Sequence, residues 1–85
     1  MKIHKKLDLH GQRYKEASEN LDKFLNDSAV SAVTNPGISV LVIHGNGGGV
    51  LQQMTTEYLK ECTFISRFYE APSDLGGCGA TIVEF

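Results

Sequence analysis

Three features are scarce or missing in this 85-residue sequence, and each bears on the class of protein. No apolar run approaches the roughly 20 residues of a membrane helix, and no apolar stretch follows the first basic residues as in a signal peptide. There are only two cysteines, Cys62 and Cys78, and neither belongs to a CxxC pair. We therefore expect a cytoplasmic protein with no membrane segment, two reduced cysteines that serve as small packing residues, and no metal centre.

Length and composition fit one small folded domain rather than two. Hydrophobic residues make up 41% of the chain and charged residues 21%, which are ordinary shares for a globular domain. The sequence contains no internal repeat and no obvious linker. We expect a single domain over residues 1–85, in which residues 1–6 form a basic N-terminal extension.

Charge is distributed unevenly along the chain. The net charge of −2 does not favour a nucleic-acid-binding protein. However, residues 1–15 carry five basic side chains against one acidic side chain, whereas residues 16–85 carry three against nine. This asymmetry is compatible with an anionic partner near the N-terminal part. A solvated basic tail would give the same pattern, so both interpretations stay open.

The periodicity of apolar residues predicts four strands and two helices. We expect strands at residues 6–11, 38–44, 64–71 and 80–85, and helices at residues 12–33 and 49–61. The inner face of the first helix is expected to carry Tyr14, Ala17, Leu21, Phe24 and Leu25, with Ser28 as a further candidate. That of the second helix is expected to carry Leu51, Met54 and Tyr58, with Cys62 as a further candidate.

The order β-α-β-α-β-β predicts the fold class. Strands that alternate with helices run parallel, with right-handed crossovers, and the last two strands, joined by a short loop, are expected to be antiparallel. We therefore expect an α/β (α+β) two-layer sandwich, in which both helices cover one face of a mixed four-stranded sheet. The other face would be open to a partner.

A glycine-rich segment, His-Gly-Asn-Gly-Gly-Gly at residues 44–49, separates the apolar strand from the second helix. Glycine allows positive φ and close approach of the backbone to a ligand, and amides at a helix N-terminus attract phosphate. It is not a nucleotide-binding fingerprint, because no lysine follows and the third glycine position holds Val50. The segment predicts a phosphate cradle formed by Gly45, Asn46, Gly47, Gly48 and Gly49. A βα turn without a ligand is the alternative.

Three motifs carry a resemblance to a known family. Leu-Asp-Leu-His-Gly at residues 7–11, Ile-His-Gly-Asn-Gly-Gly-Gly-Val-Leu at 43–51 and Gly-Gly-Cys-Gly-Ala-Thr-Ile-Val-Glu-Phe at 76–85 resemble, in order and spacing, a small MutS-related (Smr) domain. The resemblance covers residues 7–85. It implies a fold similar to the C-terminal domain of translation initiation factor three. It also implies an endonuclease that nicks DNA or cleaves RNA, in recombination and repair or at stalled ribosomes, either alone or within a larger MutS-type chain.

The resemblance also assigns candidate site residues. Asp8, His10 and His44 occupy functional positions of the family. Histidine changes charge near neutral pH, so His44 could act as general base or acid and His10 in the opposite role. Asp8 could orient a histidine or bind a divalent cation, although the spacing requires no cofactor. Further contacts to nucleic acid would come from basic side chains, namely Lys5, Lys6, Arg13 and Lys15.

The chain differs from the family pattern where the phosphate would bind. The family usually has lysine, threonine and arginine where this sequence has Asn46, Gly48 and Gln52, so two cations are replaced by neutral side chains. The leading hypothesis is an Smr-type endonuclease acting on DNA or RNA. The alternatives are a non-catalytic module that binds nucleic acid or the ribosome, and a protein-interaction domain that uses the open sheet face.

Overall fold

The computed structural model describes residues 2–85, and Met1 lies outside this range. Its elements, in chain order, are β1 (Ile3–Asp8), α1 (Tyr14–Thr34), β2 (Ser39–Ile43), α2 (Val50–Glu61), β3 (Arg67–Glu70), the short 3-10 helices η1 (Ser73–Leu75) and η2 (Gly77–Gly79), and β4 (Ala80–Glu84). The predicted order of strands and helices is confirmed. Across residues 2–85, the helices are too short or too polar to cross a bilayer.

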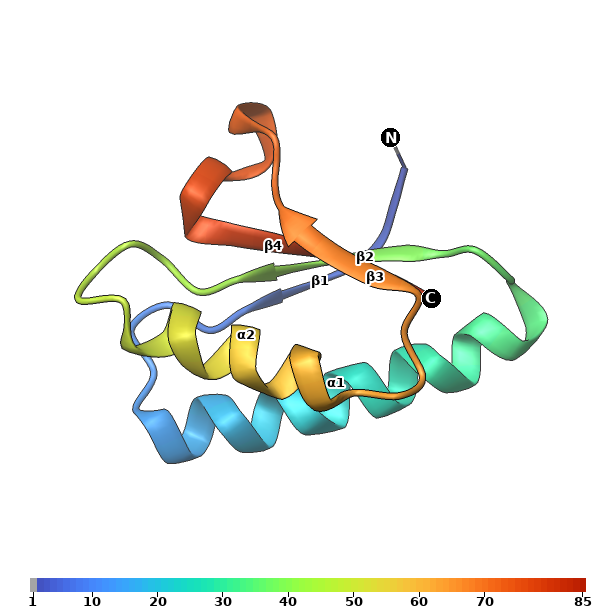
Figure 1. The fold of residues 1–85 in the computed structure, drawn as a ribbon, viewed down its shortest axis with the longest axis horizontal. Coiled ribbons are helices and arrows are strands. Elements are labelled where there is room, and N and C mark those ends of the chain that lie inside the picture. Colours follow the sequence, from blue (N-terminus) through green and yellow to red (C-terminus); the bar gives the residue numbers. More distant parts are fainter. Residues whose placement is uncertain (1) are drawn as a thin grey trace.

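The four strands form one mixed sheet in the order β1-β2-β4-β3. β1 pairs parallel to β2, while β4 pairs antiparallel to both of its neighbours, β2 and β3. The first three strands therefore run in one direction, and the last strand lies between two of them in the opposite direction. Both helices cover the same face of the sheet (Figure 1), which confirms the predicted two-layer sandwich.

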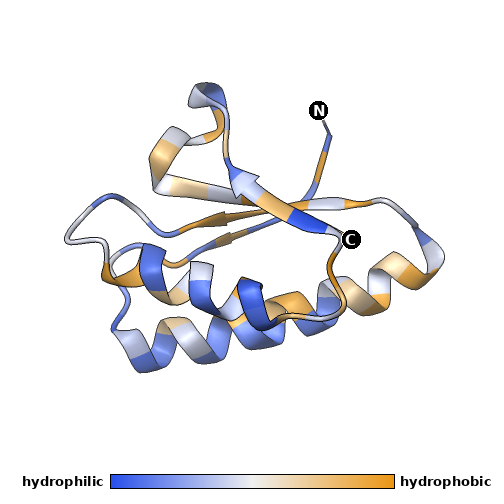
Figure 2. Ribbon diagram, in the orientation of Figure 1, coloured by the Kyte–Doolittle hydropathy of each residue, from blue (hydrophilic) through white to orange (hydrophobic). Residues whose placement is uncertain are grey.

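The main core lies between the sheet and the two helices. In α1 the buried residues recur at the three- and four-residue spacing that keeps side chains on one helical face: Ala17, Leu21, Leu25 and Ser28. They pack against apolar side chains of the central strands, among them Val40, Val42 and Val83. The alternation of hydrophobic and hydrophilic residues along the elements is visible in Figure 2. Burial of each large apolar side chain contributes about 1.5–3 kcal/mol to stability.

Two predicted helix faces need correction. Tyr14 was expected in the core but is 56% exposed, because it lies in the first turn of α1, beside the segments that follow β1 and β2. In α2, Thr55 and Leu59 are buried together with Met54, whereas Leu51 and Tyr58 are half-buried. The buried face of α2 is thus rotated about the helix axis by about one residue from the predicted face.

The start of the first strand was also predicted wrongly. β1 begins at Ile3, so residues 3–6 of the expected N-terminal extension belong to the sheet. Lys5 and Lys6 are exposed there because β1 is an edge strand with a neighbour on one side only. Lysine is well tolerated on an edge, where it blocks pairing with another chain. The other strands are shorter than predicted by one or more residues.

The face of the sheet away from the helices is not fully open. The connection between β3 and β4 folds over it (Figure 1) and forms a second, smaller cluster of buried residues. This cluster consists of Leu41, Ala71, Ala80 and Ile82. The expectation of a bare second face is therefore wrong for the part beneath η1 and η2.

The cysteines do not pack as expected. Both thiols are free, but Cys62 is only half-buried and Cys78 is exposed. Cys62 faces the space between the helices, where burial raises the pKa of its thiol. Neither residue is therefore a fully buried packing residue of the core.

Candidate functional site at the carboxyl ends of the parallel strands

Three segments that are distant in sequence meet at one end of the sheet. The amide of Leu9, just after β1, donates to the carbonyl of Ile43 at the end of β2, with an N···O distance of 2.6 Å. The amides of His44 and Gly45 both donate to the carbonyl of Gly79, each at 2.9 Å. These bonds place the Asp8–Gly11 segment, the glycine-rich segment and the end of η2 side by side. We call this end of the sheet the rim.

Asp8 and His10 form an exposed pair at the rim. His10 Nδ1 lies 2.5 Å from Asp8 Oδ1, and the backbone amide of His10 donates to the same oxygen at 3.0 Å. These two hydrogen bonds, the side-chain bond above all, hold the pKa of Asp8 below its ordinary value. Because an ionised carboxylate can only accept, His10 Nδ1 carries the hydrogen. Nε2 of His10 remains available on a side chain that is 67% exposed.

His44 has the opposite environment. It is only 4% exposed, and both of its ring nitrogens have partners within the protein. Nδ1 lies 3.1 Å from the carbonyl oxygen of Gly45, and Nε2 lies 2.9 Å from Thr81 Oγ1. A carbonyl can only accept, so Nδ1 donates and Nε2 accepts from the Thr81 hydroxyl. His44 therefore links the start of the glycine-rich segment to β4, and the ring is not free for proton transfer in this conformation.

The glycine-rich segment leaves a run of backbone amides without partners. Gly45, Gly48 and Gly49 have φ values of 75°, 68° and 74°, a region that is costly for other residues. Within residues 2–85, the amides from Asn46 to Gln52 donate to no protein acceptor. They lie at the N-terminus of α2, where the helix dipole adds partial positive charge. This arrangement is suited to binding an anion.

These groups surround one hollow of about 490 Å³ at the rim. One wall is formed by the segment after β1, with His10, Gln12 and Tyr14. The other wall is formed by the glycine-rich segment and the first turn of α2, with Asn46, Gly47, Val50 and Leu51. The side chain of Asn46 is held toward η2, since Cys78 Sγ donates to its Oδ1 at 3.2 Å.

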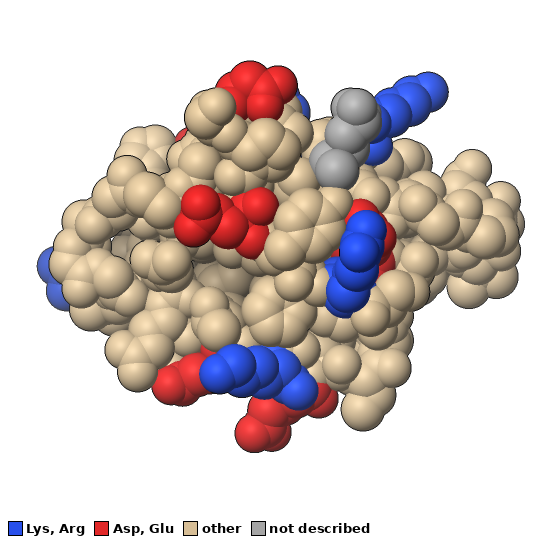
Figure 3. All heavy atoms as spheres, turned by 45° about the horizontal axis from the view of Figure 1, so that its top comes forward, with Lys and Arg blue, Asp and Glu red and all other residues tan. Residues whose placement is uncertain are grey.

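Several predicted contact residues lie outside this hollow. Arg13 and Lys15 line a separate shallow site on the outside of α1, together with Glu16 and Glu19. Lys5 and Lys6 lie further back along β1. On the face shown in Figure 3, basic side chains are separated by acidic and uncharged atoms, so residues 2–85 form no continuous basic surface there. The positive potential inside the hollow would come chiefly from backbone amides and helix dipoles.

Sequence reasoning missed three residues that shape the rim. Thr81 fixes His44, the carbonyl of Gly79 fixes two amides, and the Gln12 side chain donates to the carbonyl of Asp8 at 3.3 Å. Thr81 did carry a signal, because it is a polar residue between two apolar neighbours, Ala80 and Ile82. A buried hydroxyl needs a partner, and His44 is that partner.

The rim combines two chemical capabilities. A histidine paired with a carboxylate can accept or donate a proton, and unpaired amides can stabilise negative charge on an oxyanion. His10 lines the same hollow as four residues with unpaired amides, namely Asn46, Gly47, Val50 and Leu51. Gly48 and Gly49 of the predicted cradle do not line it, and Gly49 lines a separate hollow on α2. Among residues 2–85, no group of three or more His, Cys, Asp or Glu side chains is placed to hold a metal ion.

The fold and the rim define a two-layer α+β domain with a glycine-rich loop at the carboxyl ends of its parallel strands. The family model of the Smr domain matches residues 7–85. The chain therefore belongs to the Smr domain family, which confirms the resemblance drawn from the three motifs.

Known relatives agree with this assignment. The chain is 44% identical over 80 residues to a protein named Endonuclease MutS2 from Streptococcus sanguinis, and 42% identical over 79 residues to Endonuclease MutS2 from Helicobacter pylori. These matches cover 94% and 93% of this chain, which spans only 10% of the length of each relative. The chain is thus homologous to a small part of these larger proteins.

Solved structures show the same fold. The Smr domain of Thermus thermophilus MutS2 superimposes with a TM-score of 0.73 at 28% identity, covering 94% of this chain and 95% of that one. YdaL, a stand-alone small MutS-related protein from Escherichia coli, superimposes with a TM-score of 0.84 at 22% identity, covering 94% of this chain and 63% of that one.

Proposed function

We propose that this domain is an Smr-type endonuclease that cleaves phosphodiester bonds of DNA or RNA at the rim. The observation that carries the proposal is that His10, paired with Asp8, lines one hollow together with four residues whose amides are unpaired. These four residues are Asn46, Gly47, Val50 and Leu51. The proposal is supported by membership of the Smr family and by relatives that bear the name endonuclease. Repair and ribosome rescue remain predictions for its cellular setting.

In this proposal His10 performs the proton transfer. Its Nε2 would take the proton from the attacking oxygen or deliver one to the leaving oxygen, and Asp8 would stabilise the imidazolium that forms. The amides of Gly47, Val50 and Leu51, which line the hollow, would hold the non-bridging phosphate oxygens, on which charge increases in the transition state. Asn46 would complete the cradle without adding charge.

His44 has a supporting role in this proposal. It anchors Gly45 through the carbonyl of that residue and anchors β4 through Thr81, so that the amides stay oriented toward the hollow. Basic side chains outside the hollow would bind flanking phosphates, with an affinity that falls as salt rises: Lys5, Lys6, Arg13 and Lys15.

A second function is favoured by one observation. Asn46 and Gln52 stand where the family usually has cations, and Gln52 lines a hollow on α2 with Lys60, away from the rim hollow. Without these cations the domain could bind nucleic acid, or a ribosome, without cleaving it. Such a module would show salt-dependent binding and no strand scission.

The test is incubation of the purified protein with supercoiled plasmid and with structured RNA, beside the His10→Ala variant. We expect nicked plasmid or RNA fragments from the unsubstituted protein, and strongly reduced cleavage by His10→Ala at an unchanged melting temperature. Cleavage that persists in a folded His10→Ala protein would contradict the assigned mechanism. Binding without cleavage by the unsubstituted protein would establish the second function instead.

A further inference from the structure

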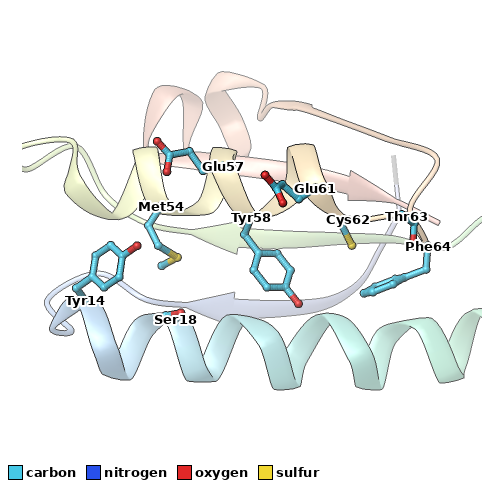
Figure 4. Close-up of a pocket in the computed structure, with 9 residues that line it drawn as sticks. All are labelled: Tyr14, Ser18, Met54, Glu57, Tyr58, Glu61, Cys62, Thr63 and Phe64. Carbon is cyan, nitrogen blue, oxygen red and sulfur yellow. The ribbon is translucent and has the colours of Figure 1, made fainter.

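Tyr14 is an aromatic residue that the fold does not use for packing. It is 56% exposed, although the next residues on its face of α1 are buried. Figure 4 shows its ring directed from the start of α1 toward α2, beside Met54. Tyr58, on the same groove between the helices, donates its hydroxyl to Asp22 at 2.6 Å. By contrast, the Tyr14 hydroxyl has no hydrogen-bond partner within residues 2–85.

The position of Tyr14 connects it to the rim. Besides lining the groove in Figure 4, it lines the rim hollow, together with the exposed side chain of Val50. Val50 is itself 57% exposed. The hollow thus has an apolar side, with Tyr14, Val50 and Leu51, next to the polar side that carries His10 and the unpaired amides.

This division of the hollow matches the chemistry of a nucleotide. Ligand sites of about 300–1,000 Å³ typically combine apolar walls with a few oriented polar groups, and 490 Å³ falls in that range. A nucleotide has an anionic phosphate at one end and a flat base at the other. Proteins that bind single strands pair a phosphate-binding groove with aromatic side chains on which bases stack. An unpaired base can stack on a side chain at little cost, whereas a base in a regular duplex must first be unpaired and unstacked.

We propose that Tyr14 is a base-stacking residue and that the rim hollow selects an unpaired nucleotide. Its phosphate would lie on the amides of the glycine-rich segment, and its base on the ring of Tyr14 beside Val50. This inference rests on the proposed function, because the phosphate end is the site described above. It adds the substrate class, which is a single-stranded or unstacked segment rather than a regular duplex.

The test is a binding titration followed by fluorescence anisotropy at low salt and 4 °C. The two probes are a fluorescein-labelled single-stranded oligonucleotide of eight nucleotides and the duplex of the same sequence. A gel verifies that the oligonucleotide is not cleaved during the titration. Tyr14→Leu, which keeps apolar volume but removes the ring, should weaken single-strand binding about tenfold or more and change duplex binding less than about twofold. Tyr14→Phe, which keeps the ring, should retain single-strand binding.

Phe64→Leu is the matched control. Phe64 is another exposed aromatic residue, 40% exposed, at the opposite end of the groove in Figure 4 and outside the rim hollow. Its replacement should leave binding unchanged, and melting temperatures verify the fold of every variant. Single-strand binding that Tyr14→Leu leaves unchanged, or an equal loss for both probes, overturns this inference and leaves the proposed function standing. Failure of the unsubstituted protein to bind either probe overturns both.

Discussion

The two histidines of the rim show how one residue type acquires different roles at neighbouring positions. His10 follows the edge strand β1, and His44 follows the central strand β2. The side chain of His10 is 67% exposed and has a carboxylate partner, whereas His44 is 4% exposed and has a hydroxyl and a carbonyl as partners. Position in the sheet therefore decides which histidine can exchange protons with a ligand and which one can only support the backbone.

The carboxylate partner adds to this difference. Asp8 accepts the hydrogen bond of His10 Nδ1 and leaves Nε2 of that ring without a partner within residues 2–85. In His44 the Gly45 carbonyl and the Thr81 hydroxyl occupy both ring nitrogens. Each of the following substitutions separates the chemistry of the exposed histidine from the structural role of the buried one.

The largest effect is expected from His10→Ala. If His10 transfers the proton, cleavage should fall by about 10²- to 10⁴-fold, with little change in stability because the side chain is exposed. The measurements are initial rates on plasmid and RNA together with thermal unfolding. A fall in activity that merely follows a loss of folded protein would contradict the assignment.

His44→Ala should act mainly on stability. It removes a buried ring and leaves the Thr81 hydroxyl without its partner, which should lower the free energy of unfolding by about 2–4 kcal/mol. Thr81→Val is the matched variant and should cost about 1–3 kcal/mol, because it leaves His44 Nε2 unpaired. Both values come from denaturant unfolding. An unchanged unfolding free energy in His44→Ala would show that the contact to Thr81 contributes nothing.

Substitutions at two glycines test how the glycine-rich segment, which His44 anchors, affects the position of His10. Gly45 has positive φ, and a Cβ there would lie 3.3 Å from the Cβ of His10. Gly45→Ala should therefore destabilise the domain by about 1–2 kcal/mol and displace His10, lowering cleavage as well. Gly47 has open space around its Cβ position and no positive φ, so Gly47→Ala should change stability by less than about 0.5 kcal/mol. Equal effects of the two substitutions in thermal unfolding would contradict this account.

The smallest expected effect concerns pH. Because the pKa of Asp8 is lowered in the folded state, the unfolded chain binds more protons in acid, and stability rises with pH in that window. This contribution is present above the ordinary pKa of 3.8 and is lost as pH falls through the lowered value. His10→Ala should move the pKa of Asp8 back toward 3.8, which a titration of its carboxyl carbon by NMR measures. An unchanged Asp8 pKa would show that His10 does not cause the shift.

The fold could be predicted from the sequence wherever apolar periodicity is strong. The segment 38–44 and both helices gave clear patterns, and their observed bounds differ from the predicted ones by one or two residues at most ends. The start of β1 could not be found in this way, because an edge strand rich in lysine lacks apolar alternation before Leu7. Tyr14 was assigned wrongly to the core. Apolar periodicity shows which residues share one face of a helix, but it does not show how far the sheet extends beneath that face.

The site was predicted only in part. The motifs placed Asp8, His10 and the glycine-rich segment at the same end of the sheet, and the structure shows them there. The burial of His44 depends on Thr81, 37 residues away along the chain. Contacts between such distant residues arise from strand order, and the sequence alone did not specify that β4 lies beside β2.

The central place of β4 has a consequence for how the domain assembles during synthesis. Pairing of β1 with β2 can begin as soon as those segments leave the ribosome, but β3 has no neighbour until β4 inserts between it and β2. Thr81 and Gly79, which hold His44 and Gly45, arrive in this last step. A chain interrupted before Gly79 would therefore retain both helices in sequence yet lack the strand that joins the two halves of the sheet, and its glycine-rich segment would lose the contacts to Gly79 and Thr81.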